Sequence, residues 1–220
     1  MKILHIHPNA AMSTRFIFPL MKKEKLLGYD TKLVVFTNNI NDKALIEINL
    51  NINSLSLPKG IINFVIFLKK QKPDIVFCHN SIQATIPLLI LKILNFKRLV
   101  YFNHGLTYLG YKGVLKGVFY VVEYLNALLS HKTLTVSTDM KNYLNKIKPN
   151  TYMIHNGSAC GLNIKIKKGK NIKKNNNKIT ITYIGRLQIR KGLKVLKQIL
   201  DFFENSNEIE WDKICPKDKK

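Results

Sequence analysis

The chain has 220 residues, 46% of them hydrophobic, which is enough for one large core or about one and a half domains. It carries 36 Lys and Arg against 13 Asp and Glu, a formal net charge of +23, which favours polyanionic partners such as nucleic acid, anionic lipid or phosphorylated substrates. Nucleic acid is disfavoured, because the aromatic residues lie within apolar runs rather than between exposed cations, where they would stack on bases.

The cysteine pattern and the apolar runs predict a cytoplasmic protein. The three cysteines are odd in number and widely spaced, which favours reduced thiols over a disulfide framework. The first residues, MKILHIHP, continue directly into an expected strand and lack the layout of a signal peptide. No apolar run reaches the roughly 20 residues that span a bilayer. The nearest, Val114–Leu129, is interrupted by Lys116, Glu123 and Asn126 and is expected to be a core-facing helix.

Strand and helix signals alternate along the chain and predict an α/β fold with a parallel sheet and helices on both faces. Runs of β-branched and apolar residues predict strands at Lys2–Ile6, Thr31–Phe36, Ser54–Leu57, Ile75–His79, Arg98–Asn103, Thr133–Val136, Thr151–Ile154 and Ile179–Ile184. Apolar residues at helical spacing predict helices at Arg15–Leu27, Ile61–Lys70, Ser81–Leu94, Leu115–Ser130, Ser137–Ile147 and Gly192–Phe203.

Residues at the ends of these elements make the boundaries specific. Ser13 or Thr14 is the expected N-cap of the first helix, after a polar loop, and Gly28 is its expected stop. Pro19 is placed near the first turn of that helix, where proline is tolerated. Pro87 is expected to kink the helix that contains it.

A lysine-rich segment separates two expected domains. Asn163–Lys178 contains seven lysines and no acid, so it is expected to be a linker or surface loop rather than part of a core. It divides the chain into domains at residues 1–162 and 179–220, with the linker at 163–178. The alternative is that these lysines form a patch that binds anionic membrane lipid.

The start of the second domain contains a candidate anion site. The strand Ile179–Ile184 is followed by Gly185, which permits a sharp turn, and Arg186 and Lys191 flank that turn before a helix begins. Two cations beside a helix N-terminus form a site suited to a phosphate group. The alternative is an ordinary strand–helix unit with two solvated cations.

This segment resembles a motif of the family-4 retaining glycosyltransferases. The letters GRL at 185–187 and KG at 191–192 are similar to the motif that opens the second of two Rossmann-like domains and holds the diphosphate of a nucleotide-sugar donor. The letters LVYFNHGL at 99–106 resemble the family's strand followed by His-Gly. The resemblance implies that His104 lies beside the transferred sugar and orients it.

Four further segments resemble the same family and occur in the family's order. They are GYDT at 28–31, KPDIV at 72–76 followed by His79, TVS at 135–137, and HNGS at 155–158 with GLN at 161–163. The last form is associated with transferases of bacterial capsule and O-antigen assembly.

The resemblance implies a fold, a reaction and a set of partners. The fold would be GT-B-like, with an acceptor-side Rossmann-type domain at 1–162 and the first strand–helix unit of an incomplete donor-binding domain at 179–220. A sugar would pass from a nucleotide sugar, with retention, to a saccharide or lipid-linked saccharide in surface-polysaccharide biosynthesis. Arg186, Lys191 and the helix N-terminus would stabilise the departing diphosphate, with no metal and no cofactor. The enzyme would act at the inner face of the plasma membrane.

Ligands of open α/β sheets bind outside the carboxyl ends of the strands, so residues at these ends are candidates for the acceptor and sugar side of the site. They are Gly105 beside His104, the expected helix cap Ser137, and Asn9 and Ser13 in the first loop. That loop departs from the family pattern, because it lacks the paired glycines that are often found there.

The C-terminal region departs further from the family. After Phe203 the chain continues as ENSNEIEWDKICPKDKK, whereas the family has several more strand–helix units and a donor-binding glutamate motif, and Glu204, Glu208 and Glu210 do not lie where that motif would. One strand and one helix cannot bury a core of their own. The alternative hypothesis is therefore a truncated, catalytically inactive remnant that binds at most an acceptor or an anionic membrane.

Two other classes of site are disfavoured. No G-x-G-x-x-G follows the first strand, which argues against a dinucleotide-dependent oxidoreductase. His5 and His7 alternate on one face of a strand, but a metal site would need further ligands that the sequence does not place.

Overall fold

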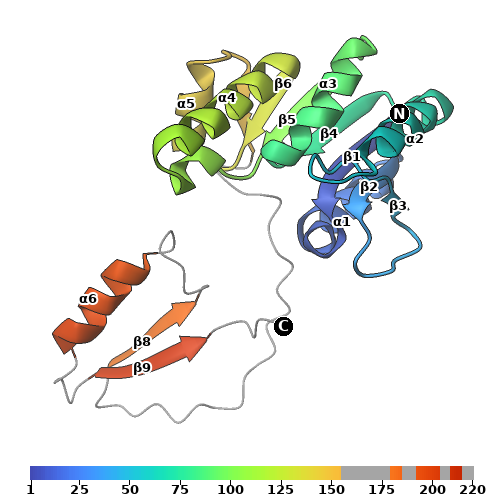
Figure 1. Ribbon diagram of the computed structural model, residues 1–220. Coiled ribbons are helices and arrows are strands. Elements are labelled where there is room, and N and C mark those ends of the chain that lie inside the picture. Colours follow the sequence, from blue (N-terminus) through green and yellow to red (C-terminus); the bar gives the residue numbers. More distant parts are fainter. Residues whose placement is uncertain (155–178, 185–191, 204–208, 215–220) are drawn as a thin grey trace. The chain divides into compact units, whose positions relative to one another are not determined.

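The computed structural model of the chain describes residues 1–154, 179–184, 192–203 and 209–214 (Figure 1). Contacts divide the chain into two units, Met1–Ile164 and Lys165–Lys220. The two units are described separately, and the site residues whose geometry is given below belong to the first.

The first unit is built on a parallel sheet of seven strands in the order β3-β2-β1-β4-β5-β6-β7. The strands are β1 (Lys2–Asn9), β2 (Asp30–Thr37), β3 (Ile46–Glu47), β4 (Ile75–His79), β5 (Leu99–Asn103), β6 (Lys132–Thr135) and β7 (Thr151–Met153). The helices are α1 (Ala10–Leu26), α2 (Leu57–Gln71), α3 (Thr85–Ile93), α4 (Gly113–Leu129) and α5 (Thr138–Asn145), with short 3-10 turns η1 (Ile82–Ala84) and η2 (Thr107–Gly110). The predicted α/β class and parallel sheet are therefore confirmed.

Helices cover both faces of the sheet, and each face has its own apolar cluster (Figure 1). On one face, Val76 of β4 packs in a cluster with Phe64 of α2 and Leu88 of α3. On the other face, Leu33 of β2 packs with Ile17 of α1. The strand order reverses direction between β1 and β4, and in open α/β sheets such a reversal marks the place where ligands bind.

The first helix begins earlier than the sequence predicted. Its N-cap is Asn9, whose side chain accepts a hydrogen bond from the Met12 amide at 3.0 Å. The helix therefore follows β1 directly, and the prediction of a polar loop between them, with Ser13 or Thr14 as the cap, is wrong. Ser13 and Thr14 lie inside the helix, and each hydroxyl donates to a backbone carbonyl of the preceding turn. Four of the first five residues of this helix, Ala10, Ala11, Ser13 and Thr14, are small or polar, so apolar periodicity did not indicate its start.

The prolines also lie in positions other than those expected. Pro19 is in the interior of α1 rather than in its first turn. Pro87 lies in the first turn of α3, because η1 forms a separate turn before it, so the expected kink within one continuous helix is wrong. The predicted strand at Ser54–Leu57 is absent, since Leu57 begins α2 and Pro58 occupies its first turn. Gly28, at φ +81°, follows α1 as predicted.

The segment Val114–Leu129 was expected to be a helix that faces the core, and the expected burial of its apolar residues is wrong. It forms α4, but the residues that α4 buries against the unit are Glu123, Asn126 and Ala127, while valines and leucines on the opposite side are exposed. Among the described residues, none of the helices has both the length and the apolar character needed to cross a bilayer.

The second unit contains β8 (Ile179–Ile184), α6 (Leu193–Phe203) and β9 (Ile209–Ile214). The first two elements match the predicted strand and helix. β9 pairs with β8 in parallel and was not predicted, although IEWDKI alternates apolar and polar residues as a strand does.

Candidate functional site

Four histidines lie together toward the carboxyl ends of three adjacent strands: His5 and His7 of β1, His79 of β4, and His104 directly after β5. In the register of the sheet, His5 lies opposite Phe77, and His79 lies opposite Phe102. Each successive histidine is therefore two residues further along its strand and on the same face of the sheet. The sequence had singled out His104 at the end of this series, but not the arrangement that supports it.

Three hydrogen bonds join Glu24 and three of these histidines into a chain. We call it the histidine chain, and its members in order are Glu24, His5, His79 and His104. Glu24 Oε2 lies 3.0 Å from His5 Nε2, His5 Nδ1 lies 3.0 Å from His79 Nε2, and His79 Nδ1 lies 3.0 Å from His104 Nε2. Glu24, His5 and His79 are buried, whereas His104 is half-buried. The chain thus connects a buried carboxylate on α1 to an accessible imidazole beside β5.

Glu24 supplies the charge at the buried end of this chain. Burial acts to raise the pKa of its carboxyl group, but the hydrogen bond and the charge of His5, together with the Thr31 hydroxyl, outweigh burial and leave the pKa below its usual value. Thr31 donates to Glu24 Oε2 at 2.9 Å. Glu24 is therefore ionised at neutral pH and acts only as an acceptor.

The direction of the hydrogen bonds follows from this anchor. Since Glu24 accepts, His5 Nε2 carries a proton. When Nδ1 of His5 carries no proton, it accepts from His79 Nε2–H. His79 Nδ1 then accepts from His104 Nε2–H, which leaves His104 Nδ1 as a hydrogen-bond acceptor. Burial is the main cause that holds the pKa of His79 well below 6.5 and lowers the pKa of His104 to about 4.

The same chain can move a proton. If His104 Nδ1 takes up a proton, His104 Nε2–H can pass its proton to His79 and His79 can pass one to His5. The added positive charge then lies beside the carboxylate of Glu24, where it is best stabilised. The chain can therefore hold His104 in one tautomer, or accept a proton released at the surface.

His7 is a second neutral imidazole at this edge, outside the chain. Its Nδ1 lies 2.9 Å from the Asn9 carbonyl, and Asn80 Nδ2 donates to its Nε2 at 3.2 Å. Burial lowers the pKa of His7 to about 4, although the Asn9 carbonyl acts against this shift. Asn80 has a φ of +71°, a left-handed conformation that is uncommon outside glycine and that often accompanies functional sites.

The turn after β5 is held in place from behind by a buried carboxyl group. Glu123 Oε2 accepts from the Tyr101 hydroxyl and from Asn103 Nδ2, each at 2.6 Å, and Glu123 Oε1 accepts from the Thr107 amide at 3.3 Å. Asn103 Oδ1 accepts from the Gly105 amide at 2.7 Å. These bonds fix the backbone on both sides of His104, so the imidazole is presented by a rigid turn.

Sequence reasoning did not identify Glu123 or Tyr101 as site residues. Burial raises the pKa of both groups, and Tyr101 is raised further by the neighbouring Glu123. A signal was present, because Glu123 is the single acid within a mostly apolar helix. Such a residue needs a buried polar partner.

The other predicted site residues have the following positions. Gly105 directly follows His104 and is exposed, and Ser137 follows β6, where its side chain caps α5 by accepting from the Met140 amide at 3.3 Å. Asn9 caps α1, and Ser13 is buried with its hydroxyl donating to the Asn9 carbonyl at 2.7 Å. Their contact with a sugar stays a prediction.

The predicted diphosphate-binding residues Gly185, Arg186 and Lys191 lie outside the described residues. Within the described parts of the chain, no group of three His, Cys, Asp or Glu residues is arranged to hold a metal ion. The ring nitrogens of the histidine chain are instead directed at one another.

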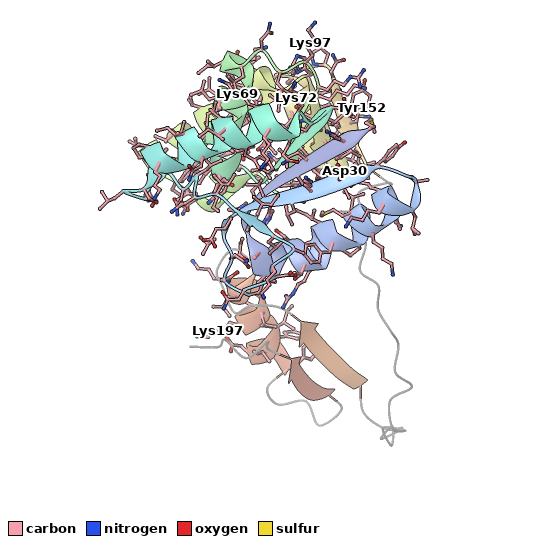
Figure 2. The ribbon with its side chains drawn as sticks, turned by 90° about the vertical axis from the view of Figure 1, so that its right-hand side faces the viewer. Asp30, Lys69, Lys72, Lys97, Tyr152 and Lys197 are labelled. Atoms are coloured by element: carbon pink, nitrogen blue, oxygen red, sulfur yellow. The ribbon has the colours of Figure 1, made fainter. Side chains whose placement is uncertain are left out.

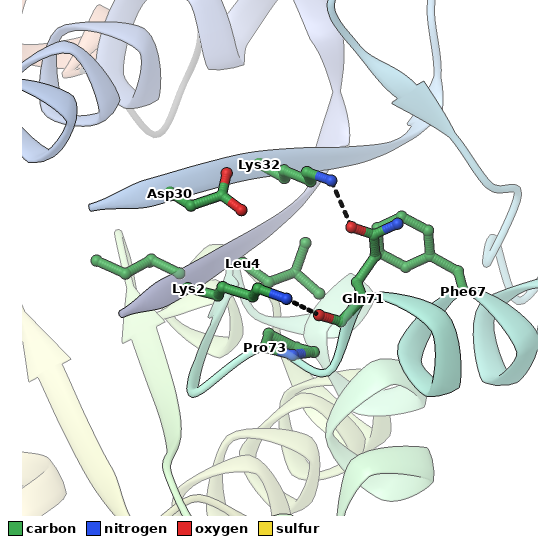
Figure 3. A pocket seen from close by; sticks show the side chains of 8 residues that line it. Lys2, Leu4, Asp30, Lys32, Phe67, Gln71 and Pro73 are labelled. Atoms are coloured by element: carbon green, nitrogen blue, oxygen red, sulfur yellow. Dashed lines mark hydrogen bonds between the residues drawn. The ribbon is translucent and has the colours of Figure 1, made fainter. Parts of the chain in front are cut away.

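The amino ends of the strands, at the opposite end of the sheet, carry several lysines but no open pocket among the described residues. Lys72 and Lys97 precede β4 and β5 there, and Lys69 is close by in the last turn of α2 (Figure 2). A small pocket at this edge is already filled by its own interactions, because Lys2 and Lys32 both donate to Gln71 (Figure 3). Its volume of about 10 Å³ leaves room for roughly one water.

Comparison with known proteins agrees with this architecture. The model of Glycosyltransferase Family 4 matches residues 32–158, more than half of the chain. No curated protein matches the chain in sequence.

Solved structures of the GT-B type resemble the chain in fold at low identity. S. aureus MnaA with UDP has a TM-score of 0.65 at 16% identity, over 99% of this chain and 63% of MnaA. UDP-GlcNAc 2-epimerase from Neisseria meningitidis with UDP-GlcNAc has a TM-score of 0.60 at 16% identity, over 99% of this chain and 67% of the epimerase. Anabaena Alr3699/HepE, in complex with UDP and glucose, has a TM-score of 0.58 at 13% identity, over 98% of this chain and 70% of HepE. The chain thus spans less than two thirds of the length of MnaA.

Proposed function

Since its match over residues 32–158 shows that the chain belongs to glycosyltransferase family 4, we propose that it takes part in transfer of a sugar, with retention, from a nucleotide sugar to a saccharide or lipid-linked saccharide. The reaction would serve assembly of a bacterial surface polysaccharide of the capsule or O-antigen type, at the cytoplasmic face of the membrane. The observation that carries this proposal is the accessible end of the histidine chain, His104, at the carboxyl ends of the strands.

The protonation state of His104 suits sugar transfer. Glycosyl transfer passes through a transition state with positive charge at the anomeric carbon. A pKa of about 4 keeps His104 uncharged at pH 7, so it does not repel that charge. Its Nδ1 would accept a hydrogen bond from a sugar hydroxyl, and the bonds from Glu123 and Asn103 would keep the imidazole in position.

A nucleotide sugar is the donor that the comparisons favour, because the similar structures include proteins solved with UDP-GlcNAc or with UDP and glucose. In the proposal, Gly185, Arg186 and Lys191 bind the diphosphate, and the two cations with the N-terminus of α6 stabilise its charge as it departs. No metal ion and no cofactor is part of the proposed reaction.

Calorimetric titration of the full 220-residue chain with a panel of UDP- and GDP-sugars tests this proposal. Arg186→Ala should abolish donor binding. His104→Ala should leave binding of the nucleoside diphosphate unchanged but remove any gain from the attached sugar. Equal binding by Arg186→Ala and parent would contradict the diphosphate assignment. Donor binding without turnover on any acceptor would favour the alternative of an inactive binding module.

A further inference from the structure

Helix α4 buries polar residues and exposes apolar ones, which is the reverse of an ordinary surface helix. Its buried side carries Glu123 and Asn126, and its exposed side carries a row of aliphatic residues. We call this row the α4 surface; its members are between 43% and 85% exposed and are Val114, Leu115, Val118, Val121, Leu125 and Leu128. An apolar row of this length on the outside of a unit indicates an interaction surface.

The inversion has a local cause in the site. Glu123 holds the turn after β5, and Asn126 Nδ2 donates to the Ser81 carbonyl at 2.8 Å. The side of α4 that faces the sheet therefore makes polar contacts through Glu123 and Asn126, next to the buried Ala127. The core of the first unit does not cover the aliphatic residues on the other side of the helix.

The width of the apolar face argues against a single partner helix. At 100° per residue, the exposed apolar and aromatic residues from Tyr124 to Leu115 span roughly 180° of the helix circumference. A two-helix seam needs only a narrow stripe with charged residues beside it. Here the positions beside the stripe are Gly117, Val122 and Tyr124, and none of them is charged.

The residues around the α4 surface match the interface of an anionic bilayer. Tyr124 is exposed beside it, and tyrosine is enriched at the headgroup level of membranes, whereas the rings of Tyr111 and Tyr120 pack against Phe119 and Tyr108. The exposed side of α4 carries no acid, because Glu123, the single acid of the helix, is buried; the exposed lysines at its start, Lys112 and Lys116, lie on the other side of the helix. The chain as a whole carries a net charge of +23, which anionic lipid would attract.

The first half of α4 is the part most open to such contact. Every residue from Gly113 to Val118 is exposed, and a shallow apolar depression beside Gly117 is lined by Val114, Val118, Val121 and Val122. We propose that the α4 surface docks onto anionic membrane, with α4 lying in the plane of the interface and its aliphatic row among the upper acyl chains. The docking does not depend on the donor site, so the two proposals fail separately.

Sedimentation of the full chain with vesicles of 70% phosphatidylcholine and 30% phosphatidylglycerol tests the docking surface. V118Q/V121Q should lower the partition coefficient roughly tenfold or more, and glutamine is a better helix former than valine, so α4 should persist. The matched control is I62Q/I66Q, which changes two residues on α2 that are 59% exposed, and it should bind as the parent does. Retention of parental binding by V118Q/V121Q would overturn the proposal.

A gain-of-binding variant makes the test independent of any loss of folding. V118W should bind these vesicles more tightly, and brominated lipids should quench its added fluorescence, whereas I62W should show neither effect. The absence of quenching in V118W would also overturn the proposal. A parent that is dimeric without lipid and a monomeric V118Q/V121Q with unchanged vesicle binding would instead assign this surface to a second copy of the chain.

Discussion

Acidification should destabilise the first unit through its neutral histidines. His7 and His104 have pKa values of about 4 in the folded chain, against 6.5 for an ordinary histidine, and burial is the main cause for both. Between these values the unfolded chain binds more protons than the folded one, so the stabilisation is fully present above pH 6.5 and is lost as the pH falls towards 4. At pH 5 each histidine should account for a loss of about 2 kcal/mol relative to pH 7.

His104→Gln isolates one of these contributions. The variant should show a difference in unfolding free energy between pH 7 and pH 5 that is smaller than the parental difference by about 2 kcal/mol. His79 adds to the parental loss because its pKa is also lowered, whereas the raised pKa of Glu123 opposes it, and both groups remain in the variant. The matched control is His131→Gln, which removes an exposed histidine and should change the pH dependence much less.

Urea unfolding followed by far-UV circular dichroism at pH 7, 6, 5.5 and 5 measures this effect. The fluorescence of Trp211, the single tryptophan, is unsuitable because this residue belongs to β9 in the second unit. A parent that is equally stable at pH 7 and pH 5, or a His104→Gln variant that keeps the whole parental dependence, would refute the assignment of neutral, buried histidines.

Two further substitutions test the supports of His104. Glu24→Gln should lower the unfolding free energy at pH 7 by about 1.5–3 kcal/mol, since it replaces a charge-assisted hydrogen bond to His5 by a neutral one. Urea unfolding measures this loss. A loss below about 0.5 kcal/mol would mean that Glu24 is not ionised against His5. Asn103→Ala should lower the unfolding free energy by about 1–3 kcal/mol, because it removes a donor to Glu123 and the acceptor of the Gly105 amide. An unchanged urea midpoint would show that the turn after β5 does not depend on this side chain.

The strands were the most predictable part of the fold because their signal is local. Six of the seven strands of the sheet are short runs of apolar and β-branched residues, and this composition identifies them without reference to the rest of the chain. β3 has two residues, Ile46 and Glu47, and exists only because β2 offers a free edge for pairing. The start of α1 was missed because its cap, Asn9, is polar and its first turn begins with two alanines, whose small side chains give no clear apolar periodicity.

The histidine chain could not be predicted because it depends on register. His5, His79 and His104 are separated by 74 and 25 residues, and they meet only because β1, β4 and β5 pair with one particular alignment. Glu24 reaches His5 from a helix on the same face of the sheet. The family resemblance included both His104 and His79, but it did not show that these two histidines bond to one another, nor that His5 and Glu24 continue the chain.

Helix α4 shows how a correct pattern can lead to a wrong expectation. Its apolar composition predicts burial, and the prediction assumes that the buried partner belongs to the same unit. Glu123 breaks the pattern, and its role behind the turn of His104 requires the polar side of the helix to face inward. The aliphatic row from Val114 to Leu128 must then face outward, so one acidic residue links the rigidity of the candidate site to the surface proposed to meet the membrane.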